Sequence, residues 1–284
     1  MRTPSLMSKV LPNKPKFIKA LGSIHILCHF ILTVFLLICI FALRINIQNK
    51  FKKAYPKLEI QPSIDGPSRI VLIRYDESEA NSVDRLIDLI DNFFEAYRTK
   101  SDRQNVASIC DYEHRPKKGQ SCPINFDNFG PCISSFYGYY SYSPCVFLIL
   151  SEIYDWIPDY YNATNELPPS MPEDLVKEIK LASAKHEDDQ IWTSCAGKDD
   201  VDKESIEAFN YYPGRGFPSY YFPATRGNNE FLGPIIAVEI VNPKPGYVII
   251  IECRIWSKNL PYVKANFDRQ ESIRFAIMKD ELVY

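Results

Sequence analysis

The sequence predicts a single N-terminal transmembrane helix followed by a mainly-β sandwich domain with one packed α-helix and disulfide bonds. Three observations support this prediction. Residues 20–43 contain no charged side chain. After them, short apolar segments separated by turn residues outnumber the one long segment with helical periodicity. Six of the eight cysteines follow the apolar segment, an even set that is typical of a disulfide-bonded domain.

The apolar segment 20–43 has 24 residues, and a helix needs roughly 20 to cross a bilayer. It is longer than the apolar part of a signal peptide, about 7–15 residues, so we expect an uncleaved anchor. The chain then divides into a cytoplasmic tail (1–19), the transmembrane helix (20–43), a stalk (44–69) and an extracellular domain (70–284).

Charge alone does not orient the span, because basic residues flank it on both sides in similar number. The six downstream cysteines favour an oxidising compartment, and the sequon Asn162-Ala163-Thr164 would be glycosylated there. Both observations predict a type II protein with its C-terminal part outside the cytosol. Within the span, His25 and His29 lie one helical turn apart and are interpreted as a polar stripe facing a partner helix, with metal or proton binding as the alternative.

The expected helix follows a first strand at 70–75. Its apolar residues recur with the 3.6-residue period from Val83 to Tyr97, so one face must be buried. A short surface helix is expected at 173–184, and the segment 186–209 is polar. The turn residues at 242–246 predict a hairpin between the strands on either side of them. The remaining expected strands are 146–150, 234–241, 247–256 and 272–278.

Little in the sequence indicates catalysis. No phosphate-binding glycine loop or zinc-protease motif is present, no Cys-x-x-Cys pair supports a zinc site, and we expect neither metal nor cofactor. Asp200 and Asp202 form a D-x-D pair, which in type II Golgi glycosyltransferases holds a divalent ion. No strand is expected before this pair, so we interpret it as a solvated loop. A net charge of −2 argues against nucleic acid as a partner.

The order of short motifs is more specific. Cys195-Ala196-Gly197-Lys198 precedes Tyr211-Tyr212-Pro213-Gly214-Arg215-Gly216, then Pro234-Ile235-Ile236-Ala237-Val238, then Ile251-Glu252-Cys253. Upstream stand Gly130-Pro131-Cys132, Gly138-Tyr139, Pro144-Cys145 and Leu150-Ser151-Glu152-Ile153. This order resembles the β subunits of the Na,K-ATPase and H,K-ATPase. The chain departs from the family where Gly214-Arg215-Gly216 replaces a second Tyr-Tyr-Gly-Lys.

The resemblance implies an immunoglobulin-like sandwich with three disulfides, Cys110–Cys122, Cys132–Cys145 and Cys195–Cys253. It also implies a non-catalytic protein of the plasma membrane, in contact with lipid and with the catalytic α subunit of a P-type cation pump. The β subunit would serve the folding, assembly, membrane delivery and K+ affinity of that α subunit. A type II glycosyltransferase using Asp200 and Asp202, or a cell-surface adhesion module, is the alternative.

A site prediction follows from the resemblance and from the chemistry of tyrosine. Tyrosine offers a large apolar face and a hydroxyl at low entropic cost, which is why it recurs at interface hot spots. We therefore expect one set of residues to form or support the main extracellular contact with the α subunit, the alternative being that both tyrosines are core residues. The set comprises Tyr211, Tyr212, Pro213, Pro234, Ile235, Ile236, Ala237 and Val238.

Overall fold

The computed structural model describes residues 29–41, 43–44, 56–63, 70–101, 106–117, 119–133, 136–154, 156–164, 166–222, 233–260 and 271–280. The chain forms two compact units, Met1–Lys53 and Ala54–Tyr284. In the first unit the described residues are helical. Part of the expected span, including His25 and Cys28, lies outside the described residues. Within the described ranges, none of the helices has the length and apolar character needed to cross a bilayer.

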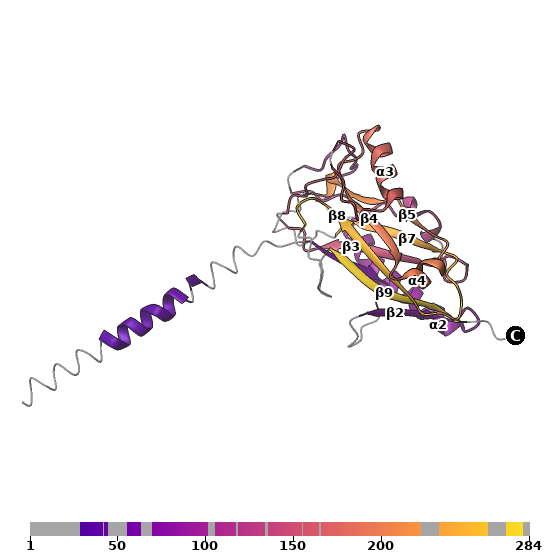
Figure 1. The fold of residues 1–284 in the computed structure, drawn as a ribbon, viewed down its shortest axis with the longest axis horizontal. Helices are drawn as coiled ribbons and strands as arrows, with labels where there is room; N and C mark the ends of the chain where they lie inside the picture. Colours follow the sequence, from indigo (N-terminus) through magenta and orange to yellow (C-terminus); the bar gives the residue numbers. More distant parts are fainter. Residues whose placement is uncertain are drawn as a thin grey trace, which may run out of the picture. The chain divides into compact units, whose positions relative to one another are not determined.

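The second unit contains two β-sheets (Figure 1). The four-stranded sheet has the order β1-β3-β7-β5 and the five-stranded sheet the order β2-β9-β8-β4-β6. Neighbouring strands are antiparallel, except that β2 and β9 are parallel. The mainly-β prediction is therefore confirmed. The strands are β1 (Lys57–Gln61), β2 (Val71–Tyr75), β3 (Cys145–Ser151), β4 (Gln190–Gly197), β5 (Ala208–Tyr212), β6 (Gly216–Pro218), β7 (Ile235–Val241), β8 (Ile249–Trp256) and β9 (Ser272–Lys279).

The long helix α2 (Ala80–Ser101) covers the four-stranded sheet together with the 3-10 helix η1 (Phe126–Ile133). Its periodic residues Val83, Ile90 and Phe94 are fully buried, as the spacing predicts. The Phe94 ring packs edge-on against Phe147 of β3, with 4.7 Å between ring centroids. The helix is thus placed by the burial of one apolar stripe on the outer face of this sheet.

A second helix also packs on a sheet, whereas the sequence prediction had only one. Helix α3 (Glu173–Ser183) buries Leu175 and Ile179 completely, in a separate apolar cluster with Trp192 of β4 and Trp256 of β8. Helix α3 therefore covers the five-stranded sheet. The packing of α3 on this sheet explains why the β4 residues that face α3, such as Trp192, are buried.

Three details of the sequence prediction are wrong. The expected stalk contains β1, which pairs with β3. The segment 186–209, which was interpreted as polar, contains β4. The side chains of Thr193 and Ser194 in this strand are buried. The hairpin at 242–246 does not form, because β7 and β8 belong to different sheets. The turn residues instead take the chain from one sheet to the other.

The six cysteines of the second unit pair as Cys110–Cys122, Cys132–Cys145 and Cys195–Cys253. This is the pairing that the resemblance implies. Cys195 and Cys253 face each other on the neighbouring strands β4 and β8. In the first unit, Cys39 is a free thiol. Cys132, Cys145, Cys195 and Cys253 are buried in the main apolar core of the second unit.

Candidate partner-binding site

Most of the predicted contact residues lie on β5 and β7, and Pro213 and Pro234 stand directly outside these strands. The strand register separates the two tyrosines. Tyr211 stands opposite Val238, and Tyr212 stands opposite Ala237. Residues opposite each other in an antiparallel pair share a face, and neighbours along a strand point to opposite faces. Tyr211 therefore faces the second sheet, and Tyr212 faces away from it.

Tyr211 connects the two sheets. Its hydroxyl oxygen accepts a hydrogen bond from the backbone N–H of Cys195 in β4, with 2.8 Å between the two atoms. The Arg215 guanidinium lies over its ring, 4.9 Å from the centroid. Burial raises the pKa of Tyr211 to about 12. Tyr211 thus holds the edge strand β5 against the other sheet.

Tyr212 lies on the outer side of β5, beside η1. Its hydroxyl donates to the Glu239 carboxylate at 3.0 Å, and the Asn210 amide donates to the same carboxylate oxygen at 2.9 Å. A Cβ on Gly130 would come within 2.7 Å of the Tyr212 ring, so only glycine permits this contact. The ring is half-buried, and Pro213 after it is exposed. This part of the loop is accessible to a partner.

Arg215 holds the loop from inside. Its guanidinium is buried and donates to the Thr193 carbonyl at 3.0 Å and to the Asp174 carboxylate of α3 at 2.6 Å. Burial alone would raise the pKa of Asp174, but the hydrogen bond and charge of Arg215 outweigh it and lower that pKa. The Gly-Arg-Gly departure from the family motif therefore links β5, β4 and α3.

The predicted residues of β7 have little direct access to solvent. Ile235 and Ile236 are buried, as are Ala237 and Val238, because β7 lies between β3 and β5 in the sheet. Pro234 is also buried. These side chains are core residues that fix the position of the exposed loop.

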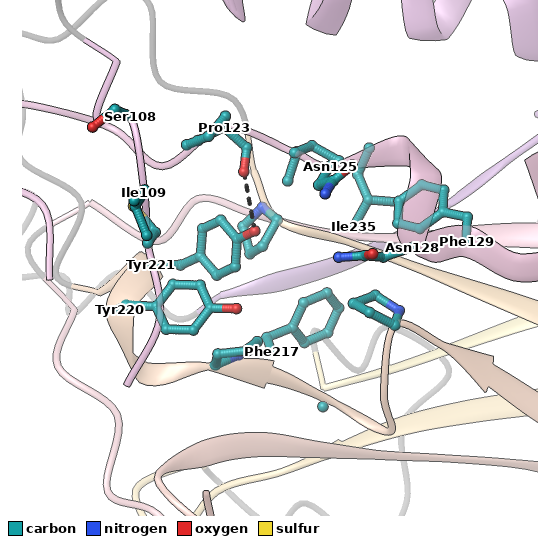
Figure 2. Close-up of a pocket in the computed structure, with 16 residues that line it drawn as sticks. Ser108, Ile109, Pro123, Asn125, Asn128, Phe129, Phe217, Tyr220, Tyr221 and Ile235 are labelled. Atoms are coloured by element: carbon teal, nitrogen blue, oxygen red, sulfur yellow. Dashed lines mark hydrogen bonds between the residues drawn. The ribbon is translucent and has the colours of Figure 1, made fainter. Parts of the chain in front are cut away.

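A cavity of about 570 Å3 opens beside this loop (Figure 2). Pro213, Pro234 and Ile235 of the predicted set line it. The other walls come from η1, from the segment around the Cys110–Cys122 disulfide, and from the 3-10 helix η2 (Ser219–Tyr221). Phe129, Phe217 and Ile235 are buried, as are the lining residues Gly216 and Pro234. The cavity thus joins the predicted contact residues to an aromatic surface formed by distant segments.

The aromatic members of this cavity and Arg215 were missed by the sequence reasoning. The run Ser219-Tyr220-Tyr221-Phe222 directly follows the predicted motif, and its aromatic content was the available signal. No sequence pattern indicates that the segment around Cys110 lies against it. That proximity depends on long-range contacts such as the hydrogen bond from Arg115 to Ser219 Oγ at 3.0 Å.

The acidic pair differs from the expectation of a solvated loop. It belongs to the short helix α4 (Asp200–Glu204), which Asp199 caps through the Asp202 backbone N–H. Asp200 is exposed, but Asp202 is buried, and its Oδ1 accepts the Ile250 backbone N–H at 3.0 Å. The expectation was wrong for Asp202 because its carboxylate satisfies backbone donors of two elements. A carboxylate used in this way is not free to share a metal ion with Asp200.

The sequon lies at the surface near the end of α3. The Thr164 hydroxyl donates to the Asn162 side-chain oxygen at 2.8 Å, and the Ala163 backbone N–H donates to the Ser183 hydroxyl at 3.0 Å. This places Asn162 on the side of the five-stranded sheet that α3 covers. The cavity is walled by other elements.

Comparisons with known proteins identify the family of the chain. The family "Sodium / potassium ATPase beta chain" matches residues 23–275. The chain is 37% identical over 209 residues to sodium/potassium-transporting ATPase subunit beta-2 of Drosophila melanogaster, covering 71% of this chain and 62% of that relative. It is 33% identical over 236 residues to subunit beta-1 of the same organism, covering 83% of this chain and 74% of that relative.

The human relative, sodium/potassium-transporting ATPase subunit beta-2, is 24% identical over 222 residues, covering 73% of this chain and 66% of the relative. The match to the Drosophila melanogaster beta-2 subunit spans 62% of that relative's length, somewhat less than two thirds. The family match extends through the disulfide-bonded domain, including the cavity and the Tyr211–Arg215 loop. The chain belongs to the sodium/potassium ATPase beta chain family.

Proposed function

We propose that the chain is a non-catalytic β subunit that assembles with the catalytic α subunit of a P-type Na+/K+ ATPase. It supports the folding and membrane delivery of that subunit and adjusts its K+ affinity. The observation that carries this proposal is the family match over residues 23–275. The structure is compatible with an accessory role, because the candidate site is an aromatic loop and cavity held by core residues.

The proposal includes a type II topology in the plasma membrane, with residues 20–43 as the span. The described part of this segment is helical and exposes large apolar side chains. Phe30, Leu37 and Phe41 are each at least 65% exposed, as expected of side chains that contact lipid or a partner helix. Three disulfides and a surface sequon in the second unit support its placement outside the cytosol.

The finer assignment of the domain as an immunoglobulin-like sandwich is also a proposal. Two mainly antiparallel sheets with a shared apolar core support it. The Cys195–Cys253 disulfide joins neighbouring strands of one sheet, however, whereas the antibody-domain disulfide joins the two sheets. The likeness therefore lies in the architecture rather than in the position of the bond.

Within the predicted contact set, we assign the direct contact to Tyr212 and Pro213. The supporting role belongs to Tyr211, Arg215 and the buried residues 234–238. This division follows orientation and exposure, since Tyr212 lies on the outer side of β5 and Pro213 is exposed, whereas Tyr211 faces the other sheet. A half-exposed tyrosine whose hydroxyl is already oriented by Glu239 loses little conformational freedom on binding.

The experiment is co-expression of the full chain with a catalytic α subunit, measuring surface delivery of the α subunit and K+-stimulated ATP hydrolysis. Both should depend on the chain. Tyr212→Ala should weaken assembly by at least about thirtyfold, the effect of losing an interface hot spot. Tyr142→Ala removes a tyrosine that is 75% exposed on a different loop and should assemble normally. Surface delivery and activity that are the same without the chain would overturn the proposal.

A further inference from the structure

A small groove opens at the C-terminal end of β8, beside the apolar cluster that α3 forms with β4 and β8. Its volume is about 120 Å3, and its lining includes Tyr161, Pro168, Trp256, Lys258, Leu260 and Glu271. Pockets that enclose a free small ligand measure roughly 300–1,000 Å3. The groove is therefore too small for a free ligand of ordinary size. It favours an occupant that is attached to the chain, because attachment supplies a high effective concentration.

One lining residue is a buried acid without a donor. Glu271 is 8% exposed, and its backbone carbonyl accepts the Ile255 N–H at 2.9 Å, which holds it against β8. Among the described residues, none donates a hydrogen bond to the Glu271 carboxylate or forms an ion pair with it. Burial of a carboxylate without a donor is unfavourable. The groove therefore suits a ligand that brings N–H or O–H groups to this carboxylate.

The rest of the lining favours a neutral ligand with an apolar face. Tyr161 and Trp256 supply aromatic surface from the cluster under α3. Lys258 is already paired with Asp159 at 3.2 Å, and Arg254 forms an ion pair at 3.7 Å within β8. Two basic residues and one acid line the groove, so no excess negative charge attracts a cation. A sugar unit meets these requirements, since a pyranose ring has an apolar C–H face and hydroxyl donors around its edge.

The attachment site for a glycan lies next to this groove. Asn162 of the sequon directly follows Tyr161, whose carbonyl accepts the Trp192 indole N–H at 2.9 Å. The Lys258 backbone N–H donates to the Asp159 carbonyl at 2.8 Å and fastens the same loop to the groove. Consecutive Cα atoms are about 3.8 Å apart. A glycan on Asn162 therefore starts within one residue of a groove wall.

We propose that this groove seats the first sugars of a glycan carried by Asn162 of the same chain. The apolar face of an N-acetylglucosamine unit packs on the Tyr161 ring, and its N–H and hydroxyl groups donate to the Glu271 carboxylate. The inference rests on the proposed placement of the second unit outside the cytosol, where the sequon is glycosylated. It gives the glycan a fixed position on the domain, covering the end of β8.

The first test measures how well the groove protects the glycan. The full glycosylated chain in mild detergent is treated with a deglycosylating enzyme without denaturation, and the rate of glycan release is followed by mass. Glu271→Leu removes the acceptor and keeps an apolar side chain of similar size, so release should be about tenfold faster. Glu166→Leu makes the same change at an exposed position beside the sequon and should leave the rate unchanged.

The second test detects the aromatic contact. In the chain labelled with 13C in its N-acetyl groups, the methyl signal of a docked sugar should move upfield of its position in the unfolded chain, because it lies near an aromatic ring. Tyr161→Leu should abolish this shift, and Tyr161→Phe should retain it, since phenylalanine keeps the ring. Both variants are first checked for intact disulfides.

Equal release rates for the wild-type chain and Glu271→Leu would overturn the inference, as would a wild-type methyl signal at the unfolded position. In either case the glycan and the proposed topology would stand. A chain that forms its three disulfides but carries no glycan on Asn162 would overturn the inference together with the proposed accessibility of the sequon. Assembly with a catalytic subunit is measured separately, so its failure is distinguishable from all of these results.

Discussion

Asp200 and Asp202 are separated by one residue, yet their carboxylates have different surroundings. The Asp200 side chain is 92% exposed and forms an ion pair with Lys203 at 2.9 Å. The Asp202 residue is 7% exposed and accepts backbone N–H groups from Asp199 and Ile250. Exposed ion pairs contribute little to stability, whereas a buried acceptor that satisfies backbone donors is costly to remove.

Asp202→Ala should therefore destabilise the domain by about 1–3 kcal/mol, because it leaves the Ile250 donor unsatisfied. Asp200→Ala should change the free energy of unfolding by less than about 0.5 kcal/mol. Thermal unfolding of the full chain in detergent compares the two variants directly. Equal stability of both would show that the Asp202 contacts contribute nothing.

His114 provides a residue-scale prediction on pH. The hydrogen bond that the His114 ring donates to the Asp111 carboxylate raises the pKa of His114 above 6.5 and lowers the pKa of Asp111 below 3.8. The His114 contribution to stability is fully present below pH 6.5 and disappears as pH rises through the raised pKa. The Asp111 contribution is present above pH 3.8 and disappears as pH falls through the lowered pKa.

NMR titration of the His114 ring should accordingly give a pKa above that of an unperturbed histidine. Asp111→Asn should return it towards 6.5, because both the charge and the strongest acceptor are removed. An unchanged titration of His114 in the variant would show that the pair does not form in solution.

At the scale of elements, the sheet register decides which predicted site residues reach the surface. The helical period of α2 could be read from the sequence because Val83, Leu86 and Ile90 follow one face. Strand β4 could not be read from the sequence in this way, because Thr193 and Ser194 are polar residues whose burial depends on packing by other elements. A turn signal at 242–246 marks a change of direction but does not indicate which sheet the next strand joins.

The same limit applies to the candidate site. The motif identified Tyr211, Tyr212 and Pro213 as a unit, and the residue types made an interface plausible. Neighbouring residues of a strand point to opposite faces, but which tyrosine faces the other sheet depends on the pairing of β5 with β7, a long-range contact. The cavity required in addition that the Cys110 segment lie against η2. Sequence motifs therefore nominated the candidate site, and tertiary contacts determine the arrangement of its residues.

The disulfides give a prediction at this scale. Removing Cys195–Cys253 should cost about 4 kcal/mol in the chain-entropy model, because the bond closes a loop with a sequence separation of 58. Removing Cys110–Cys122, with a separation of 12, should cost about 3 kcal/mol. Paired Cys→Ser substitutions and thermal unfolding measure both. A larger loss from the shorter loop would contradict the entropic ordering.

At the scale of the whole molecule, the topology can be tested through glycosylation. Enzymatic deglycosylation of the full chain should change its mass once, since Asn162-Ala163-Thr164 is the only sequon. Asn162→Gln and Thr164→Ala should each abolish the change. A chain that never gains a glycan at Asn162, although its cysteines are oxidised, would contradict the proposed position of the sequon on an accessible surface.

The central claim is that this chain is the accessory partner of a P-type cation pump. Its most direct test is affinity purification of the tagged full chain from native membranes in mild detergent, followed by identification and quantification of the proteins recovered. The account predicts a P-type ATPase catalytic subunit in equal molar amount, with K+-stimulated ATP hydrolysis in the purified complex. Recovery of the intact, disulfide-bonded chain with no P-type ATPase subunit would contradict it.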